Sequence, residues 1–155
     1  MNIERCTYDD YVEIISNIAE FWGSDRTLHL HHPMYVYEFG DTAYVIRENG
    51  RLLAYLFGFY AQTRPLAYVH LVGVRADAQR RGLGTLLYRH FMFIAQGRGC
   101  EAIKAMTGPT NAQSIAFHKK IGMQLLGEPN EAGVTVVRNY SGPGVDRVVF
   151  EQRLV

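Results

Sequence analysis

The stretch that decides the fold is Val72-Gly-Val-Arg-Ala-Asp-Ala-Gln-Arg-Arg-Gly-Leu-Gly-Thr85. An apolar run rich in Val and Leu leads into it, and apolar residues at helical spacing follow it. The stretch therefore predicts the end of a strand, a turn and the start of a helix. A helix start offers unpaired backbone N–H groups at the positive end of the helix dipole, and glycine lets a ligand approach the backbone closely. With the charges of Arg80 and Arg81, this pattern predicts a phosphate or pyrophosphate site.

Two other phosphate motifs do not fit this stretch. The P-loop pattern G-x-x-x-x-G-K-[ST] is absent, and the dinucleotide fingerprint would need a third glycine where Leu87 stands. A basic tight turn that binds no coenzyme is the simplest alternative.

The elements on either side indicate an α/β fold. Before the stretch we expect a strand at 2–6, and then a helix that opens with a Thr7/Asp10 capping box and runs to about Trp22. An antiparallel meander follows at 42–47, 52–62 and 66–74, with Asn49-Gly50 as its first turn. The middle strand is apolar on both faces, so we expect both of its faces to be covered.

The second half of the chain predicts alternating helices and strands. A helix follows Leu83 and ends near Gly97, and a strand covers 101–106. A short helix opens with a Thr110/Gln113 capping box, and closing strands at 123–126 and 147–154 flank a loop or irregular hairpin at 127–146. This order predicts a single domain over 1–155, with a mixed sheet and helices on both faces.

Composition excludes several classes of protein. The 155 residues are 48% hydrophobic and 20% charged, which argues against a disordered chain. A formal charge of +1 disfavours a binder of nucleic acid backbones, so we expect no nucleic acid partner. The longest nearly apolar run, 52–61, is too short for a membrane helix, and no secretory signal is visible, so we expect a cytoplasmic protein without membrane contact.

Two motifs carry a resemblance to a known family. Gln79-Arg-Arg-Gly-Leu-Gly84 is similar to the Q/R-x-x-G-x-G/A pyrophosphate loop of the Gcn5-related N-acetyltransferase (GNAT) superfamily. The segment from Asn111 to Met123 resembles that superfamily's N-x-x-[AS]-x-x-[FL]-[YH]-x-K-x-G-F pattern. The resemblance, which covers about 41–126, implies the GNAT fold and transfer of an acetyl group from acetyl-CoA (coenzyme A) to a primary amine. It implies direct attack by the amine in a ternary complex, with no acyl-enzyme and no metal.

The resemblance also implies which residues bind coenzyme A. They lie on the end of the predicted strand, where Gly73 would form a β-bulge, on the loop, and on the second motif. These residues are Leu71, Val72, Gly73, Val74, Gln79, Arg80, Arg81, Gly82, Leu83, Gly84, Thr85, Asn111, Ser114, Phe117 and Lys120.

The catalytic residues are less directly indicated. His118 stands where relatives often carry a tyrosine that protonates the leaving thiolate, and it either does this or only packs, leaving the step to water. Tyr140 is the reserve proton donor. His70 is a candidate base or a core histidine bonded to the backbone, with Glu38 and bulk solvent as alternatives.

Residues 24–40 are harder to interpret. His29, His31 and His32 show no fourth ligand at metal spacing, so we expect an acceptor wall or a solvated loop rather than a metal site. Tyr35, Tyr37 and Phe39 predict either one buried strand face or an aromatic wall beside the acceptor.

The partner and the activity each leave alternatives. The acceptor is a small-molecule amine, an amino acid or a protein N-terminus, and an aminoacyl-tRNA acceptor is disfavoured by the charge. A non-catalytic acyl-CoA-binding sensor or interaction module on the same fold is the alternative to an enzyme. The Val-Val-Phe run at 148–150 allows a homodimer. Cys6 and Cys100 match no zinc or redox spacing, so we expect both to be reduced.

Overall fold

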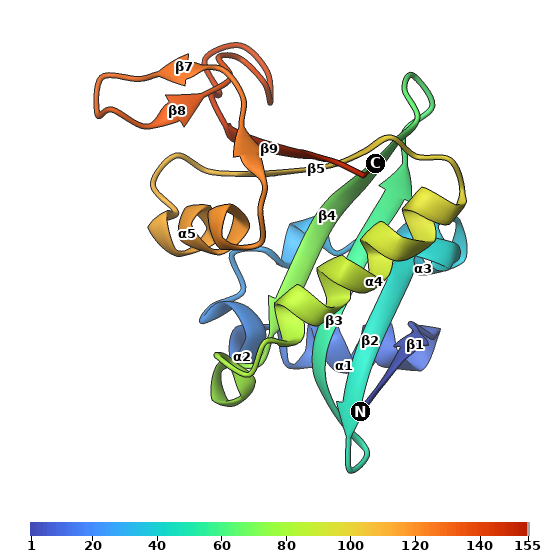
Figure 1. The fold of residues 1–155 in the computed structure, drawn as a ribbon. Helices are drawn as coiled ribbons and strands as arrows, with labels where there is room; N and C mark the ends of the chain where they lie inside the picture. The colour runs from blue at the N-terminus through green and yellow to red at the C-terminus, as the bar shows by residue number, and fades with distance from the viewer. Residues whose placement is uncertain (155) are drawn as a thin grey trace. The chain divides into compact units, whose positions relative to one another are not determined.

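A computed structural model describes residues 1–154 (Figure 1). Its main sheet is mixed and has seven strands in the order β1-β2-β3-β4-β5-β9-β6, which confirms the α/β class expected from the sequence. Contacts divide the chain into two compact units. The first contains 1–59 and 69–94, the second contains 60–68 and the chain from Ala95 onward, and each is described in turn.

The first unit is built on β1 (Asn2–Arg5), β2 (Ala43–Glu48), β3 (Arg51–Tyr60) and β4 (Leu66–Val74). β2 pairs antiparallel with both β1 and β3. Asn49 and Gly50 both adopt positive φ, 52° and 79°, which confirms the predicted hairpin turn. From Leu52 to Gly58 every residue of β3 is buried, so the strand is covered on both faces as expected.

The N-terminal helix is interrupted. The Thr7/Asp10 capping box opens α1 (Tyr8–Ser16) as predicted, but Asn17 separates it from α2 (Ile18–Trp22). The Asn17 side chain donates a hydrogen bond to the Glu13 carbonyl at 2.7 Å. Asparagine often competes with the helical backbone in this way, so the apolar periodicity alone overestimates the length of one continuous helix.

Residues 34–39 are not a strand, so that part of the sequence-based interpretation is wrong. Pro33 precedes a short helix, α3 (Met34–Tyr37), because its fixed φ of −63° suits a helix start. On a helix, positions two apart point in different directions. Tyr35 is therefore buried, whereas 65% of Tyr37 is exposed.

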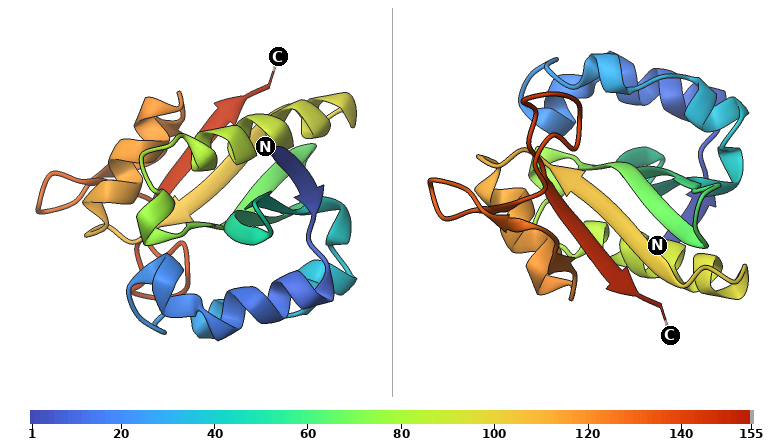
Figure 2. Two further views of the ribbon diagram at one scale, coloured as in Figure 1. Left: turned by 90° about the horizontal axis from the view of Figure 1, so that it is seen from below. Right: turned by 90° about the horizontal axis from the view of Figure 1, so that it is seen from above.

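Helices cover both faces of the strands in the first unit (Figure 2). On one side lie α1, α2 and α3 with the short turns η1 (Leu28–Leu30) and η2 (Gly40–Thr42), and on the other lies α4 (Leu83–Gly97). Neighbouring residues of β2 face opposite layers. Val45 belongs to the apolar cluster with α1 and α2, while the Tyr44 ring lies 4.8 Å from that of His90 on α4.

Gly73 on β4 is fixed by close packing. A Cβ at this position would lie 2.6 to 2.9 Å from the ring and hydroxyl of Tyr55 on β3. That is closer than carbon atoms can approach, so any larger residue would displace the Tyr55 ring. The packing gives a reason for glycine here that is independent of the predicted β-bulge, which stays a prediction.

The second unit is built around β9 (Val148–Arg153). This strand pairs antiparallel with β5 (Ala102–Thr107) and with β6 (Gln124–Leu125). Residues 148–150 are fully buried within this unit, and the homodimer that the Val-Val-Phe run allows stays a prediction. The predicted irregular hairpin at 127–146 contains β7 (Glu128–Pro129), β8 (Thr135–Val136) and a bridge between Val137 and Arg147.

The second unit also contains α5 (Ala112–Lys120), whose N-cap lies one residue later than predicted. The Asn111 side chain, not that of Thr110, accepts a hydrogen bond from the Ser114 N–H at 3.1 Å. Asparagine is at least as good an N-cap as threonine, so the Thr110/Gln113 capping box is wrong. Among residues 1–154, no helix is both long and apolar enough to cross a membrane.

Candidate functional site

The segment between β4 and α4 forms an open turn. After a short turn η3 (Ala76–Ala78), Arg80 adopts φ 65° and Gly82 adopts φ 77°. Glycine takes this left-handed conformation easily, but an arginine in it costs roughly 1–2 kcal/mol. Strained backbone of this kind often marks a functional segment.

Backbone donors collect in this turn. Within residues 1–154, the backbone N–H groups from Arg80 to Thr85 donate no hydrogen bond, and the first donor after them is that of Leu86, which reaches the Gly82 carbonyl at 3.0 Å. These groups lie at the N-terminus of α4, whose dipole adds positive potential. The turn can therefore accept an anion with several negatively charged oxygens.

The two arginines of the turn differ in their contacts. Arg81 forms a two-point ion pair with Glu48, at 2.8 and 3.1 Å, which raises the pKa of Arg81 and lowers that of Glu48. Arg80 is exposed and makes no hydrogen bond or ion pair within the described chain. The Arg80 side chain is thus available to an anion, and Arg81 offers its backbone N–H.

β4 leads into this turn with alternating faces. Leu71 and Gly73 on one face of the strand are buried, whereas Tyr68, His70, Val72 and Val74 on the other face are half-buried. His70 is held within the first unit: its Nε2–H donates to the Leu30 carbonyl at 2.9 Å, and its ring stacks on Tyr35 at 4.4 Å. Burial lowers the pKa of His70, against a smaller opposite effect of this hydrogen bond. The side chain is neutral at pH 7, with its lone pair on Nδ1.

His31 is buried, which neither interpretation of the histidine segment anticipated. Its Nδ1–H donates to the Thr27 carbonyl at 2.8 Å, and its Nε2 accepts from the Tyr55 hydroxyl at 2.6 Å. The same hydroxyl oxygen accepts from Trp22 Nε1 at 2.6 Å. Both ring nitrogens of His31 and the Tyr55 hydroxyl are therefore hydrogen-bonded, so His31 stabilises the core instead of facing an acceptor.

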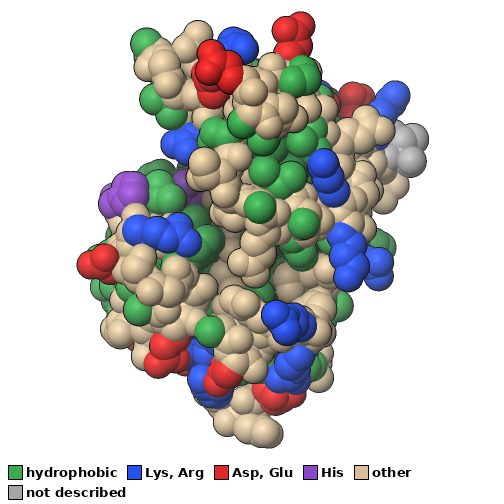
Figure 3. Space-filling model, turned by 90° about the vertical axis from the view of Figure 1, so that its left-hand side faces the viewer, with side chains coloured by type: hydrophobic (Ala, Val, Ile, Leu, Met, Phe, Trp, Pro, Cys, Tyr) green, Lys and Arg blue, Asp and Glu red, His purple; other side chains and the backbone are tan. Residues whose placement is uncertain are grey.

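The other two histidines of this segment point elsewhere. His29 is exposed, and His32 Nδ1 accepts from the Met34 N–H at 3.1 Å at the start of α3. Figure 3 shows histidine side chains lying among hydrophobic and basic ones on one face of the molecule. Within residues 1–154, no three His, Cys, Asp or Glu side chains lie close enough together to hold a metal ion.

His118 is buried in the second unit. Its Nδ1–H donates to the Ser114 carbonyl at 2.7 Å, and its ring stacks on Phe150 at 4.2 Å. Burial lowers the pKa of His118, and the backbone hydrogen bond offsets this only in part. At neutral pH the imidazole is therefore uncharged, which disfavours it as a proton donor.

The remaining predicted residues of the second unit are more accessible. Lys120 is exposed at the end of α5, and Phe117 is half-buried beside His118. The Tyr140 ring lies 5.1 Å from the Lys104 ammonium.

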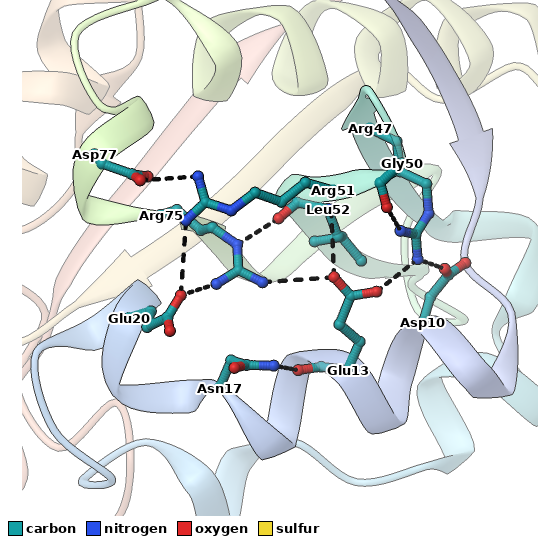
Figure 4. Close-up of polar contacts among 10 residues, drawn as sticks. All are labelled: Asp10, Glu13, Asn17, Glu20, Arg47, Gly50, Arg51, Leu52, Arg75 and Asp77. Atoms are coloured by element: carbon teal, nitrogen blue, oxygen red, sulfur yellow. Dashed lines mark hydrogen bonds and ion pairs between the residues drawn. The ribbon is translucent and has the colours of Figure 1, made fainter.

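A buried arginine that no sequence pattern indicated lies close to the open turn at residues 80–85 (the anion turn). Arg75 follows β4 directly, and only 4% of its side chain is exposed. Figure 4 shows it between Glu13 and Glu20. A charged residue after an apolar strand normally indicates the solvated end of that strand, so the sequence contains no signal that this one turns inward.

Comparison with known proteins fits this geometry. The model of the acetyltransferase (GNAT) family matches residues 9–123, about three quarters of the chain. The chain belongs to the acetyltransferase (GNAT) family. No curated protein matches the chain in sequence.

Solved structures of GNAT enzymes have the same fold. The ribosomal-protein-S18-alanine N-acetyltransferase of Escherichia coli is 19% identical with a TM-score of 0.71, covering 99% of this chain and 93% of that one. Ard1 of Thermoplasma volcanium is 16% identical with a TM-score of 0.74, covering 99% and 97%. An aminoglycoside 6'-N-acetyltransferase complexed with coenzyme A is 12% identical with a TM-score of 0.70, covering 100% and 98%. The family confirms both the resemblance and the assignment of this GNAT protein as an N-acetyltransferase.

The buried histidines of this GNAT protein predict a pH-dependent stability. Burial lowers the pKa of His31, His70, His90 and His118, so the unfolded chain binds protons at a higher pH than the folded chain. As the pH falls through about 6.5, the unfolded state is protonated first and the free energy of unfolding decreases. Urea denaturation between about pH 8 and pH 5, above the range where carboxylates titrate, measures this decrease.

Two variants test whether buried histidines cause this decrease in the free energy of unfolding. His31→Gln, or His70→Gln if the first does not fold, is expected to give a smaller decrease of stability with falling pH than the wild type shows. A stability that stays constant or rises towards the acid end contradicts the described environments.

Proposed function

We propose that this protein transfers an acetyl group from acetyl-CoA to a primary amine by direct attack. The observation that carries the proposal is the set of unpaired backbone N–H groups from Arg80 to Thr85 at the start of α4. When bound, acetyl-CoA supplies a thioester whose carbonyl carbon accepts the lone pair of the amine and whose sulfur leaves as a thiolate.

The turn suits the pyrophosphate of coenzyme A. N–H groups at a helix start bind phosphate oxygens without a metal, and the left-handed Gly82 turns successive N–H groups towards one side. Arg80 adds a charge that no other side chain neutralises. Gln79, whose side chain lies 3.4 Å from the Val74 carbonyl, positions the start of the turn.

β4 would hold the pantetheine arm by backbone hydrogen bonds. Residues Leu71 to Val74 are extended and lead directly to the pyrophosphate turn, so one ligand can follow both. A backbone N–H of this strand would polarise the thioester carbonyl. In the second motif, Ser114, Phe117 and Lys120 stay predicted coenzyme contacts. Asn111, whose Oδ1 caps α5, also stays a predicted coenzyme contact.

The amine must lose a proton before it attacks. We assign this step to Nδ1 of His70, directly or through water, because Nε2 is fixed on the Leu30 carbonyl. The lowered pKa keeps His70 neutral and able to accept a proton at neutral pH.

The thiolate must gain a proton as it leaves. Tyr140 is assigned this role in preference to His118, because its hydroxyl is an O–H donor whereas burial keeps His118 uncharged and its Nδ1–H is used by the Ser114 carbonyl. His118 then serves to pack α5 against Phe150.

The acceptor class is an amine of a small molecule or of a protein N-terminus. The Escherichia coli enzyme named above acts on an alanine of ribosomal protein S18, and another structural neighbour acts on aminoglycosides, so the fold accommodates both kinds of acceptor. A coenzyme-binding protein without catalysis is the second candidate, favoured by the buried histidine at the position of the family's tyrosine.

Calorimetry with matched charge reversals tests the coenzyme site. Arg80→Glu places a carboxylate at the open N–H groups and is expected to weaken acetyl-CoA binding about tenfold or more, since phosphate contacts of this kind contribute about 1.5–3 kcal/mol. Arg89→Glu makes the same change of charge on the exposed face of α4, away from the turn, and is expected to bind as the wild type does.

The proposed site requires Arg80→Glu to bind acetyl-CoA more weakly than Arg89→Glu does. Equal affinities of Arg80→Glu and the wild type would place the coenzyme elsewhere, and no binding by the wild type would refute the proposal. Binding without release of free thiol on a panel of small amines, amino acids and peptides would favour the non-catalytic candidate.

Removing one hydroxyl tests the proton donor. Tyr140→Phe is expected to lower kcat about 100-fold with the affinity for acetyl-CoA unchanged, because a general acid typically contributes that much. His118→Phe, measured with the same amine, is expected to change kcat far less. A larger loss of kcat in His118→Phe than in Tyr140→Phe would assign the proton donor to His118. An unchanged kcat in both variants would indicate that water protonates the thiolate.

A further inference from the structure

Arg75 is a buried cation that joins three elements of the first unit. Its Nε donates to the Leu52 carbonyl on β3 at 2.5 Å, Nη1 pairs with Glu20 on α2, and Nη2 lies 3.5 Å from Glu13 on α1. The guanidinium also lies 4.7 Å from the centre of the Phe21 ring. Figure 4 shows the contacts of Arg75 with Leu52, Glu13 and Glu20 converging on its guanidinium.

These contacts hold the helices as well as the arginine. A buried guanidinium is tolerated only when its donors are paired, so Glu13 and Glu20 must stay in place. Glu13 is shared, because it also accepts from the Leu52 N–H at 3.3 Å and from Arg47 at 2.9 Å. A displacement of α1 or α2 would therefore leave buried charge unpaired.

The backbone of Arg75 belongs to the approach to the anion turn. Its N–H donates to the Leu53 carbonyl at 2.9 Å, and its carbonyl accepts from the Ala78 N–H at 2.9 Å, which forms the turn η3. Arg51 forms a second connection between this turn and α2. Arg51 contacts Asp77 of that turn at 2.8 Å and lies 3.9 Å from Glu20.

We propose that Arg75 is a positioning residue that couples the coenzyme turn to α1 and α2. Ordering of residues 80–85 by a bound pyrophosphate is transmitted through η3 and the Arg75 guanidinium to Glu13 and Glu20. The inference rests on the proposed coenzyme site, and it adds that filling this site rigidifies the two helices before the acceptor binds. By reciprocity, loss of the coupling also weakens coenzyme binding.

Hydrogen exchange with coenzyme A as the probe tests this coupling. In the wild type, saturating coenzyme A is expected to slow exchange in peptides covering 80–87 and also in peptides covering 8–22, the latter about fivefold or more. In Arg75→Lys the slowing at 80–87 remains, but that at 8–22 is lost. Lysine keeps the charge and cannot bond to Leu52, Glu13 and Glu20 at once.

A second pair of variants tests the coupling without replacing the buried Arg75, in case Arg75→Lys does not fold. Glu20→Gln removes the charge of a half-exposed partner and is expected to reduce the slowing at 8–22, whereas Asp25→Asn, an exposed carboxylate that makes no described contact, leaves it unchanged. A purely structural role would lower the stability of Arg75→Lys but leave the coenzyme-induced slowing at 8–22.

The outcomes separate this inference from the proposed function. If coenzyme A protects 80–87 in the wild type but not 8–22, or protects 8–22 equally in Arg75→Lys and Glu20→Gln, the coupling is refuted and the coenzyme site stands. If 80–87 are not protected in the wild type, the proposed site is refuted, and the coupling with it.

Discussion

The close approach of Tyr55 to Gly73 is the constraint on which the rest of the first unit depends. The ring occupies the space that a Cβ at position 73 would need, and its hydroxyl joins Trp22 on α2 to His31 after η1. His31 in turn holds the Thr27 carbonyl, while His70 on β4 holds that of Leu30. The segment that precedes α3 is thus fixed to β3 and β4 by hydrogen bonds whose donors and acceptors are all paired.

The anion turn has the opposite character. Around it, buried polar groups are satisfied: Arg75 by two carboxylates and a carbonyl, and Glu13 by two arginines and an N–H. From Arg80 to Thr85 the described chain leaves a run of successive backbone donors open, next to a strained arginine backbone and the positive end of a helix. Because open N–H groups at the positive end of a helix attract anions, this arrangement supports the proposed anion site.

The sequence predicted most of the fold because its signals are local. Alternation placed β4, Asn49-Gly50 placed the hairpin, and the Thr7/Asp10 pair placed the start of α1. Where tertiary contacts decide, the prediction was wrong or incomplete. Pro33 turned an alternating aromatic segment into a helix, Asn17 interrupted another helix, and His31 turned into the core because Tyr55 and Thr27 offered it partners.

The same division holds for the site. The proposed anion turn was visible as glycines and arginines at a helix start, but the inward direction of Arg75 depends on carboxylates more than fifty positions away along the chain. The burial that lowers the pKa of His118 likewise comes from packing on Phe150, far away in sequence. No local pattern encodes either of these environments.

The central claim is that the open backbone N–H groups of residues 80–85 hold the pyrophosphate of coenzyme A. The most direct measurement is a titration of ¹⁵N-labelled protein with coenzyme A, followed through the backbone amide signals. The account predicts the largest shift changes at Arg80 to Thr85, because hydrogen bonds to phosphate oxygens form there. Signals of these residues that stay in place while amides elsewhere in the chain move would contradict it.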